Sequence, residues 1–419
     1  MTRRIVVVGG SMGGLRAAEQ LRAAGWTETI TVIGTETHLP YNRPPLSKEL
    51  LENPGTTADA FDSVKFRHRS SVSDVQWQLG TEVIGANLAE NTLTLDTGET
   101  VAYDGLVIAT GLRPRRLPLP GPLRGRHVLR TLEDAVELHQ ELRPGTKVAV
   151  IGAGFIGCET AATATKLGCT VTLIEGTSGP MQRALGEELS AGIRDYLVQQ
   201  GVTYHGHAKV AGLLSTQADT ESDSSCNGIR LADGTEIMAD VIIESVGSIP
   251  NVEWLEGNDI DISNGVLCDE HLRVVGTKNA VAVGDVARFP DLRNGSGARR
   301  IEHWSIPGDT AKIAAKALIA ELNNTALPEP AIPLPSFWSN QFDLKIQGVG
   351  SPNLATRIVE LEGSAKTPHD GVVMGYYQDQ ALVAVVSVGL PADRQLHYRQ
   401  LVDKRHSNQP QQDTQLQAI

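Results

Sequence analysis

The stretch Ile5-Val6-Val7-Val8-Gly9-Gly10-Ser11-Met12-Gly13-Gly14 has a counterpart later in the chain, Val148-Ala149-Val150-Ile151-Gly152-Ala153-Gly154-Phe155-Ile156-Gly157. Each copy is a short β-branched run, followed by closely spaced glycines and then by residues that favour a helix. This pattern is the strand–turn–helix start of a dinucleotide-binding unit, in which a pyrophosphate binds backbone N–H groups at the helix N-terminus. Two such units predict that the chain holds two dinucleotides and passes electrons from one to the other.

Each unit continues in the order expected of a βαβ fold. The first predicts a helix over Leu15–Gly25 and a strand over Ile30–Ile33, and Thr35 and Glu36 follow that strand. The second repeats this order and reaches Glu175 after its own next strand. An acid in this place binds the hydroxyls of the adenosine ribose. In the first unit either Thr35 or Glu36 is the candidate.

Composition and charge exclude several classes of protein. The 419 residues suffice for two or three domains, and 41% hydrophobic with 21% charged residues is ordinary for a soluble α/β protein. No apolar run reaches the roughly 20 residues of a membrane span, and no signal peptide is seen, so we expect a cytoplasmic protein without a membrane partner. A net charge of −12 disfavours nucleic acid. The four cysteines lack CxxC spacing, so neither disulfides nor a metal site is expected.

Further segments complete the organisation. Val241–Gly247 and Ala280–Asp285 are predicted to be return strands of parallel sheets, and Thr216–Asn227 is predicted to be a hairpin loop. The proline-rich segment Pro328–Pro335 is predicted to be a linker, and the final domain after it is predicted to consist of strands with an alternating pattern. The tail from His406 has no hydrophobic periodicity and is predicted to be disordered.

One string is much more specific than the glycine patterns. It reads Leu39-Pro40-Tyr41-Asn42-Arg43-Pro44-Pro45-Leu46-Ser47-Lys48. Supporting strings are Ala109-Thr110-Gly111, Leu129-Arg130-Thr131-Leu132-Glu133-Asp134-Ala135, Gly284-Asp285, Arg300-Ile301-Glu302-His303-Trp304 and Phe337-Trp338-Ser339-Asn340-Gln341. With them, over roughly residues 4–400, the chain resembles the two-dinucleotide-binding flavoprotein reductases, and within these the oxygenase-coupled NAD(P)H:ferredoxin reductases.

The resemblance implies an α/β protein with two Rossmann-like dinucleotide-binding domains, the NAD domain being inserted in the FAD domain, plus an α+β C-terminal domain. The expected boundaries are a first FAD-binding segment at 1–116, an NADH-binding domain at 117–242, a second FAD-binding segment at 243–325, a C-terminal interface domain at 326–405 and the disordered tail at 406–419.

For FAD, the turn at Gly9, Ser11, Gly13 and Gly14 is expected to hold the pyrophosphate, with Ser11 in place of the usual middle glycine. The other FAD-binding candidates implied by the resemblance are Thr35, Glu36, Arg43, Lys48, Val83, Ala109, Thr110, Gly111, Arg130, Gly284, Asp285, Glu302, His303 and Trp304. For Val83, packing in the apolar core is an equally good interpretation. The chain departs from relatives at Ser305-Ile306-Pro307-Gly308, where they usually start a helix with Asn-Ala.

For NAD, Gly152, Gly154 and Gly157 form a complete fingerprint, and Glu175 is expected to favour NADH over NADPH by repelling a 2′-phosphate. The remaining NAD candidates are Phe155, Ile156, Glu159, Arg183 and Gly247. The resemblance also implies three catalytic candidates, Lys48, Glu159 and Trp304. Lys48 is expected near flavin N5, Glu159 near the nicotinamide and Trp304 against both rings. A plain alternative makes Glu159 a first-turn acid favoured by the helix dipole.

The segment 39–55 contains no cysteine, which argues against a thiol–disulfide reductase on the same scaffold. Electrons should therefore leave for an external acceptor, which the resemblance implies is an acidic [2Fe–2S] ferredoxin serving a cytochrome P450 or Rieske oxygenase. Three groups could form a basic docking face, of which the last is preferred: Arg67/His68/Arg69, Arg113/Arg115/Arg116 and Arg394/Arg399/Lys404/Arg405. The protein is expected to be a monomer or homodimer. Alternatives are a redox sensor resembling apoptosis-inducing factor and an NADH:rubredoxin or quinone reductase.

Overall fold

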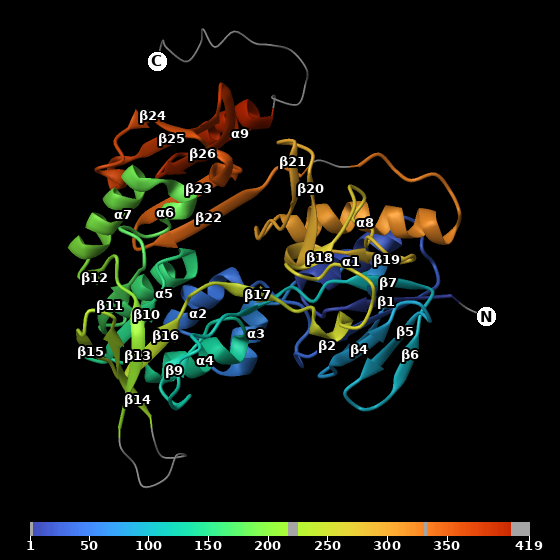
Figure 1. Ribbon diagram of the computed structural model, residues 1–419, viewed down its shortest axis with the longest axis horizontal. Coiled ribbons are helices and arrows are strands. Elements are labelled where there is room, and N and C mark those ends of the chain that lie inside the picture. The colour runs from blue at the N-terminus through green and yellow to red at the C-terminus, as the bar shows by residue number, and fades with distance from the viewer. Residues whose placement is uncertain (1–2, 217–224, 331–332, 404–419) are drawn as a thin grey trace.

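The computed structural model describes residues 3–216, 225–330 and 333–403, and it contains two parallel sheets and one antiparallel sheet that each organise a part of the chain (Figure 1). The predicted tail at 406–419, Lys404 and Arg405 lie outside the described residues, as does most of the predicted loop within Thr216–Asn227. Within the described residues, no helix has the length and apolar character to cross a membrane.

The first sheet has the order β19-β7-β1-β2-β3, and all its neighbouring strands run parallel. Strands β19, β7, β1 and β2 are almost wholly buried, as parallel strands covered on both faces must be, whereas the edge strand β3 is only partly buried. Helices α1 and α8 pack against each other beside it. The bounds are β1 Arg4–Val8, β2 Thr29–Gly34, β3 Gln76–Leu79, β7 Gly105–Ile108, β19 Ala280–Ala282, α1 Met12–Ala23 and α8 Ile306–Leu322.

Helix α1 begins three residues earlier than the predicted helix, because two glycines of the turn already belong to it. Gly14 allows this start. A Cβ there would lie 2.0 Å from the carbonyl oxygen of Gly9, so any side chain would push the helix away from the strand. Helix α8 likewise begins at Ile306, with Pro307 in its first turn. Proline is well tolerated there, so the departure from the family sequence preserves a helix start.

The second sheet has the order β12-β11-β10-β16-β9 and is also parallel throughout. The strand predicted at Val241–Gly247 ends at Glu244, and the one predicted at Ala280–Asp285 ends at Ala282. In both, the chain turns away before the glycine. The bounds are β9 Arg126–His127, β10 Lys147–Ile151, β11 Thr170–Ile174, β12 Thr203–His205, β16 Val241–Glu244, α4 Leu132–Glu141, α5 Phe155–Lys166, α6 Gln182–Leu185 and α7 Glu187–Gln199.

Two short antiparallel strands, β8 (Leu112–Pro114) and β17 (Ser248–Pro250), join the two parallel units. The chain leaves the first unit at β8 and returns at β17, so the second unit is an insertion. On this basis we propose the domain division expected from the sequence, with one change. The end of the inserted domain moves from residue 242 to a point after β16, because residue 242 lies inside that strand.

Smaller elements surround these sheets. Strands β4 (Val83–Asn87), β5 (Thr92–Leu95) and β6 (Thr100–Ala102) form a meander, with a turn at Thr97–Gly98 between β5 and β6. The others are β13 Val210–Ser215, β14 Cys226–Leu231, β15 Glu236–Met238, β18 Val266–Leu267, β20 Ala287–Asp291, β21 Ser296–Arg299, α2 Glu49–Glu52, α3 Thr57–Val64, and the 3₁₀ turns η1 Pro44–Ser47, η2 Ser70–Val72, η4 Glu253–Leu255, η5 Gly284–Val286, η6 Pro352–Leu354 and η7 Pro368–Asp370.

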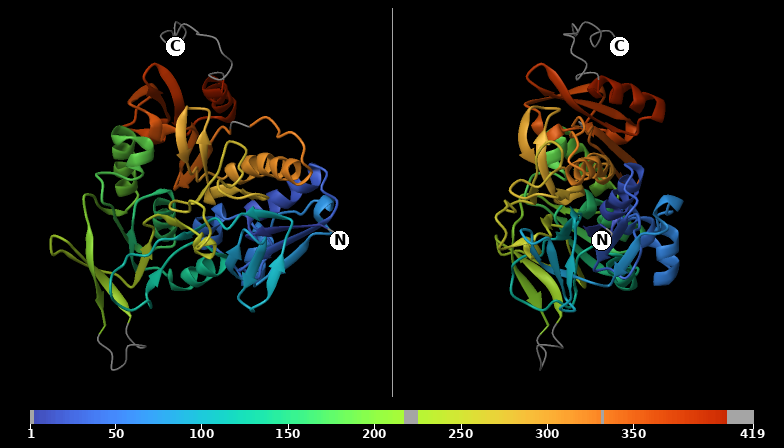
Figure 2. Two further views of the ribbon diagram at one scale, coloured as in Figure 1. Left: turned by 45° about the vertical axis from the view of Figure 1, so that its right-hand side comes forward. Right: turned by 90° about the vertical axis from the view of Figure 1, so that its right-hand side faces the viewer.

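The C-terminal sheet is antiparallel, in the order β22-β23-β26-β25-β24, and lies beside α6 and α7 of the inserted unit (Figures 1 and 2). It shares an apolar core with that unit, and the buried Tyr376 hydroxyl donates to the Leu185 carbonyl at 2.7 Å. Strand β22 packs on α5. The bounds are β22 Ser336–Gln341, β23 Leu344–Gly350, β24 Arg357–Gly363, β25 Val372–Gln378, β26 Ala381–Val388 and α9 Ala392–Asp403.

Candidate functional site

The two glycine turns leave the first N–H groups of α1 and α5 without a side-chain partner. The N-cap residues, Ser11 and Gly154, make no capping side-chain bond, and neither helix has an acid in its first turn. A Cβ on Gly154 would meet nothing within 4 Å. Free N–H groups at a helix N-terminus bind phosphate, so both turns fit the pyrophosphate of a dinucleotide.

The acids that follow the two units differ in their partners. Glu175 accepts hydrogen bonds from the backbone N–H groups of Ala153, at 2.8 Å, and Thr177, at 3.0 Å. Glu36 accepts from the Tyr41 hydroxyl, at 2.5 Å, and forms an ion pair with Arg43. Burial raises the pKa of Glu36, but Arg43 and the Tyr41 hydroxyl outweigh it, and the net shift is downward. Both carboxylates are therefore held in place by their donors.

Thr35, the other ribose candidate, is exposed. Glu36, which is partly buried and held by Tyr41 and Arg43, is the more fixed of the two candidates, and the contact of either with the ribose stays a prediction.

Two partly buried arginines lie at the first turn. Arg43 donates to Tyr41, to the Arg130 carbonyl at 2.6 Å, to Ser11 Oγ at 3.4 Å and to Glu36, while its Nε is buried without a partner. Burial lowers the pKa of Arg130, and the neighbouring Arg43 lowers it further. Two cations that repel each other in a partly buried place fit a bound pyrophosphate, which would supply the missing negative charge.

Asp285 lies on η5, at the carboxyl end of β19, with Gly284 before it at φ +77°. Burial raises its pKa to about 6, although Arg130 acts in the opposite direction. A carboxylate with a raised pKa beside an arginine is a candidate for a functional site.

The loop after β7 closes the same site. The Thr110 hydroxyl donates to the Asn251 carbonyl at 2.7 Å. This bond joins the segment that leaves the first unit to the segment that returns to it. Ala109 brings its carbonyl against Gly9, and Gly111 lies beside Arg130. Val83 is 7% exposed and belongs to the apolar core of the first unit, so its contact with FAD stays a prediction.

Lys48 and Glu159, two of the catalytic candidates, meet at the junction of the units. The Lys48 ammonium donates to Glu159 Oε2 at 2.5 Å, and the Ser47 hydroxyl donates to the same oxygen at 2.5 Å. Ser339 of β22 donates to Oε1 at 2.7 Å. Glu159 is the fifth residue of α5 and is 5% exposed, so the alternative of an exposed first-turn acid is wrong.

Sequence reasoning missed Ser47 and Ser339 as functional residues. Both lie in sequence strings that resemble the family, and this was the only sign of a role that the sequence offered. No spacing rule predicts that residues so far apart in the chain contact the same carboxylate.

The third catalytic candidate, Trp304, is 42% exposed. Its Nε1–H donates to Asn42 Oδ1 at 3.0 Å, and its ring meets Trp338 edge to face at 5.5 Å. Beside it, the pKa of His303 is lowered to about 4 by burial and by Arg299, and its Nδ1 is buried without a partner. Glu302 accepts from Ser248 at 3.0 Å and pairs with Arg300 at 2.8 Å.

The other NAD candidates lie around the second turn. Gly247 has φ +98° and faces open space, and Phe155 packs on Phe337 with ring centroids 5.2 Å apart. Ile156 is 46% exposed, and Arg183 is exposed on α6. Gly152 and Gly157 touch each other: a Cβ on Gly157 would lie 2.0 Å from the Gly152 carbonyl oxygen.

The four cysteines, Cys158, Cys169, Cys226 and Cys268, are all free and buried. Burial raises the pKa of Cys158 well above its ordinary value, so it is not a reactive thiol. The burial of all four fits a role in packing.

Four of the eight described residues in the expected docking groups already lie beside an acid. Arg113 pairs with Glu253 at 2.5 Å, Arg116 with the buried Glu244 at 3.1 Å, and Arg394 with Glu362. Arg69 lies 3.6 Å from Glu19. These groups are therefore weaker sources of positive potential than their sequences indicate. Arg67, Arg115 and Arg399 remain exposed, and His68 is half-buried against Trp77.

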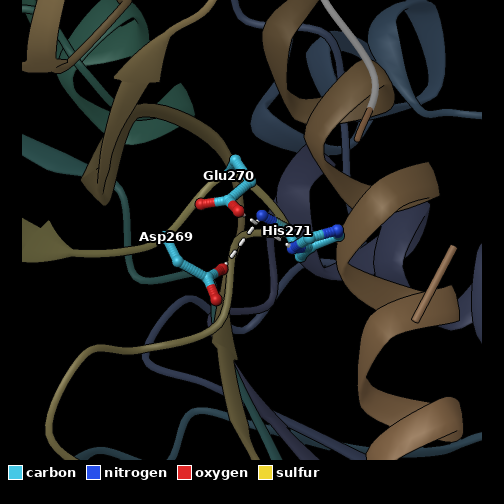
Figure 3. Close-up of side chains that lie close together, drawn as sticks. All are labelled: Asp269, Glu270 and His271. Carbon is cyan, nitrogen blue, oxygen red and sulfur yellow. Dashed lines mark hydrogen bonds and ion pairs between the residues drawn. The ribbon is translucent and has the colours of Figure 1, made fainter. Parts of the chain in front are cut away.

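One cluster of acids and a histidine, Asp269, Glu270 and His271, lies in a turn after β18 (Figure 3). The Asp269 carboxylate accepts from the His271 and Arg273 backbone N–H groups and pairs with the Arg273 guanidinium at 2.7 Å. Its charge is thus already balanced, and the turn is explained without a cation.

The family model described as pyridine nucleotide-disulphide oxidoreductase matches residues 3–310, and the one described as reductase C-terminal matches residues 336–418. The ferredoxin–NAD(+) reductase component of the p-cumate 2,3-dioxygenase system of Pseudomonas putida is 35% identical over 411 residues, which cover 97% of this chain and 95% of the relative. Putidaredoxin reductase CamA, also from Pseudomonas putida, is 32% identical, covering 93% and 89%.

A crystal structure of the covalent putidaredoxin reductase–putidaredoxin complex matches with a TM-score of 0.85 and 30% identity, covering 96% of this chain and 93% of that one.

Proposed function

Because the chain belongs to the pyridine nucleotide-disulphide oxidoreductase family, we propose that its site is that of an NADH-dependent ferredoxin reductase. The enzyme uses FAD and NAD, and it supplies electrons to a ferredoxin that serves an oxygenase, either a Rieske dioxygenase or a cytochrome P450. The dithiol chemistry in the family's name has no counterpart here, because the cysteines are buried and none lies in the segment 39–55.

One contact carries this assignment. Lys48 from the first unit and Glu159 from the second form a buried ion pair between the two dinucleotide turns. Burying a charged pair costs free energy, so such a pair at the junction of the units is more readily explained by a functional role. We propose that the role is to act where the two redox cofactors meet.

When bound, FAD supplies the redox chemistry, taking two electrons from NADH and releasing them one at a time. We propose that the α1 N-terminus, Arg43 and Arg130 hold its pyrophosphate, that Glu36 holds its ribose, and that Asp285 accepts from hydroxyls of its ribityl chain. Lys48 then offers a positive charge to the flavin edge, where reduction adds negative charge.

We propose that the α5 N-terminus, with Gly154 at its cap, holds the pyrophosphate of NADH. Glu175 accepts from the ribose hydroxyls and repels a 2′-phosphate. Gly247 lets the dinucleotide approach the backbone, and Glu159 and Trp304 flank the nicotinamide.

For the partner we propose an acidic [2Fe–2S] ferredoxin that docks over the exposed Trp304–Trp338 pair, next to the C-terminal sheet. Burial raises the pKa of Asp309, and Arg399, exposed on α9, carries a positive charge close enough to that carboxyl to oppose part of the rise. A cytoplasmic location and a monomeric or homodimeric state remain predictions.

The test is anaerobic stopped-flow absorbance of the yellow holoprotein, mixed first with NADH and then with a [2Fe–2S] ferredoxin. We expect rapid bleaching of the flavin, then rapid reoxidation by ferredoxin. The Trp338→Ala variant should keep the NADH step and raise the KM for ferredoxin several-fold, whereas Ile84→Ala, an exposed apolar residue on β4, should change neither. Bleaching without ferredoxin turnover would overturn the assignment and favour a sensor or another acceptor.

A further inference from the structure

The carboxylate of Glu159 is held by donors from two parts of the chain that lie outside its own unit. Ser47 and Lys48 belong to the first unit, Glu159 itself to the inserted unit, and Ser339 to the C-terminal sheet. Ser47, Glu159 and Ser339 are 4%, 5% and 0% exposed. Water therefore cannot replace a donor that is lost.

The two oxygens of this carboxylate have different partners. Oε2 accepts from Ser47 and Lys48, whereas Oε1 accepts from Ser339 alone among the described residues. A carboxylate held at one oxygen only can rotate about its last side-chain bond. The Ser339 bond at 2.7 Å prevents that rotation and so keeps Oε2 directed at the ammonium of Lys48.

Ser339 is itself oriented by its strand neighbour on the same face. The Gln341 side-chain amide donates to Ser339 Oγ at 3.1 Å and lies 3.4 Å from the sulfur of Met181. Because Gln341 fills one acceptor site of the hydroxyl, the Ser339 proton is left to point at Glu159. Gln341 is 0% exposed, and both residues lie on β22, which pairs with β23 along its whole length.

Lys48 Nζ has three N–H donors, of which Ser47 and Glu159 engage two among the described residues. The third is left for a group bound at the junction. The direction of that third donor depends on where the other two are held, and therefore on Glu159.

We infer that Ser339, which no spacing rule marks as functional, is a positioning residue for the reaction: through Glu159 it fixes the ammonium of Lys48 toward the flavin, and the C-terminal domain thereby sets the environment of a cofactor bound by the other two units. The inference rests on the proposed function for the cofactor that Lys48 faces.

The experiment compares the holoproteins of Ser339→Ala, Glu159→Gln, their double variant and a control, Ser387→Ala. Ser387 lies on β26 of the same sheet, is 6% exposed and makes no side-chain hydrogen bond within the described residues. Two quantities are measured: the visible absorption maximum of the oxidised flavin, and the limiting rate constant and apparent Kd of its reduction by NADH.

Ser339→Ala should lower the limiting rate constant about tenfold, the size expected when one buried hydrogen bond to a charged group is lost, and change the NADH Kd less than about twofold. It should also shift the flavin absorption maximum in the same direction as Glu159→Gln. The double variant should be no slower than Glu159→Gln, because both changes act through one carboxylate. Gln341→Met should give a smaller effect of the same kind, and it serves as the second variant if Ser339→Ala folds poorly.

The inference is overturned if Ser339→Ala behaves like Ser387→Ala, or if its effect adds in full to that of Glu159→Gln. Failure of the wild-type flavin to be reduced by NADH would overturn the proposed function instead. The absorption maximum would still decide the role of Ser339, since it is measured without NADH.

Discussion

The turn before α1 and the turn before α5 share their backbone but differ in what surrounds them. In both turns, a Cβ on the first glycine, Gly9 or Gly152, would lie 2.2 Å from a carbonyl oxygen of the segment that follows the neighbouring strand. A Cβ on the last glycine, Gly14 or Gly157, would lie 2.0 Å from the carbonyl oxygen of the first glycine. This is one packing solution used twice.

The surroundings then diverge. The first turn is covered by the partly buried guanidinium of Arg43, which reaches Ser11, with Arg130 beside it. In the second turn, Gly154 faces open space and Ile156 is 46% exposed. A closed, charged site suits a cofactor that stays bound, and an open site suits one that is exchanged in every catalytic cycle. We therefore expect substitutions at the two turns to separate retention of FAD from affinity for NADH.

Arg43→Met should have the largest effect, because it leaves the half-buried Glu36 carboxylate without its ion pair. We expect a loss of about 3 kcal/mol in the free energy of unfolding and purification largely without flavin. The measurements are the flavin-to-protein absorbance ratio and urea unfolding. Arg113→Met, which breaks the exposed pair with Glu253, is the matched control and should cost less than about 1 kcal/mol. A yellow, stable Arg43→Met protein would contradict the closed-site comparison.

Gly157→Ala and Gly154→Ala should separate the packing role from the binding role within one turn. The first places a Cβ on the Gly152 carbonyl oxygen and should destabilise the inserted unit by about 1–3 kcal/mol. The second meets no atom within 4 Å, so it should unfold like the wild type but bind NADH about tenfold more weakly, with full FAD content. Thermal unfolding and NADH titration decide this, and equal stability losses in the two variants would show that the turn is not open.

Glu175→Gln should reduce discrimination between the two nicotinamide dinucleotides. Removal of the negative charge lowers the repulsion of a 2′-phosphate, and we expect the ratio of kcat/KM for NADPH to that for NADH to rise about tenfold, or about 1.4 kcal/mol. Steady-state kinetics with both dinucleotides measure it. Glu187→Gln, an exposed acid on α7, is the control. An unchanged ratio would mean that another residue reads the ribose.

Much of this comparison could be predicted from the sequence, and the reason is local. Glycine spacing, the strand before it and the acid after the next strand all lie within one βαβ unit. The two turns and Glu175 could therefore be placed by counting, and the first ribose candidate could be narrowed to Thr35 or Glu36. The bonds between Ser339 and Glu159 and between Thr110 and Asn251 could not, because they join residues across an inserted unit. The pairing of the arginine groups was missed for the same reason: Glu244 and Glu253 are distant in the chain from Arg116 and Arg113.

Asp285→Asn tests whether the first site is strained without its cofactor. Burial raises the pKa of Asp285 to about 6, so between about pH 4 and 6 the folded state holds a proton that the unfolded state has lost. The free energy of unfolding contributed by Asp285 therefore falls as the pH rises through this range. His303 acts in the opposite sense: its pKa is lowered to about 4, so its contribution rises with pH up to about 6.5. In the wild type the two contributions oppose each other.

The flavin-free Asp285→Asn protein should consequently be more stable than the wild type by about 1–2 kcal/mol at pH 7, with the difference vanishing near pH 4. Urea unfolding across this pH range measures it, with Asp62→Asn, an exposed acid on α3, as the control. In the presence of FAD the order should reverse, because the variant loses the anion that accepts from the bound cofactor. A variant that is less stable in both states would show that Asp285 stabilises the fold itself. The reversal would instead show that the closed first site lowers the free energy of unfolding of the flavin-free protein. We expect no such loss of stability at the open second turn.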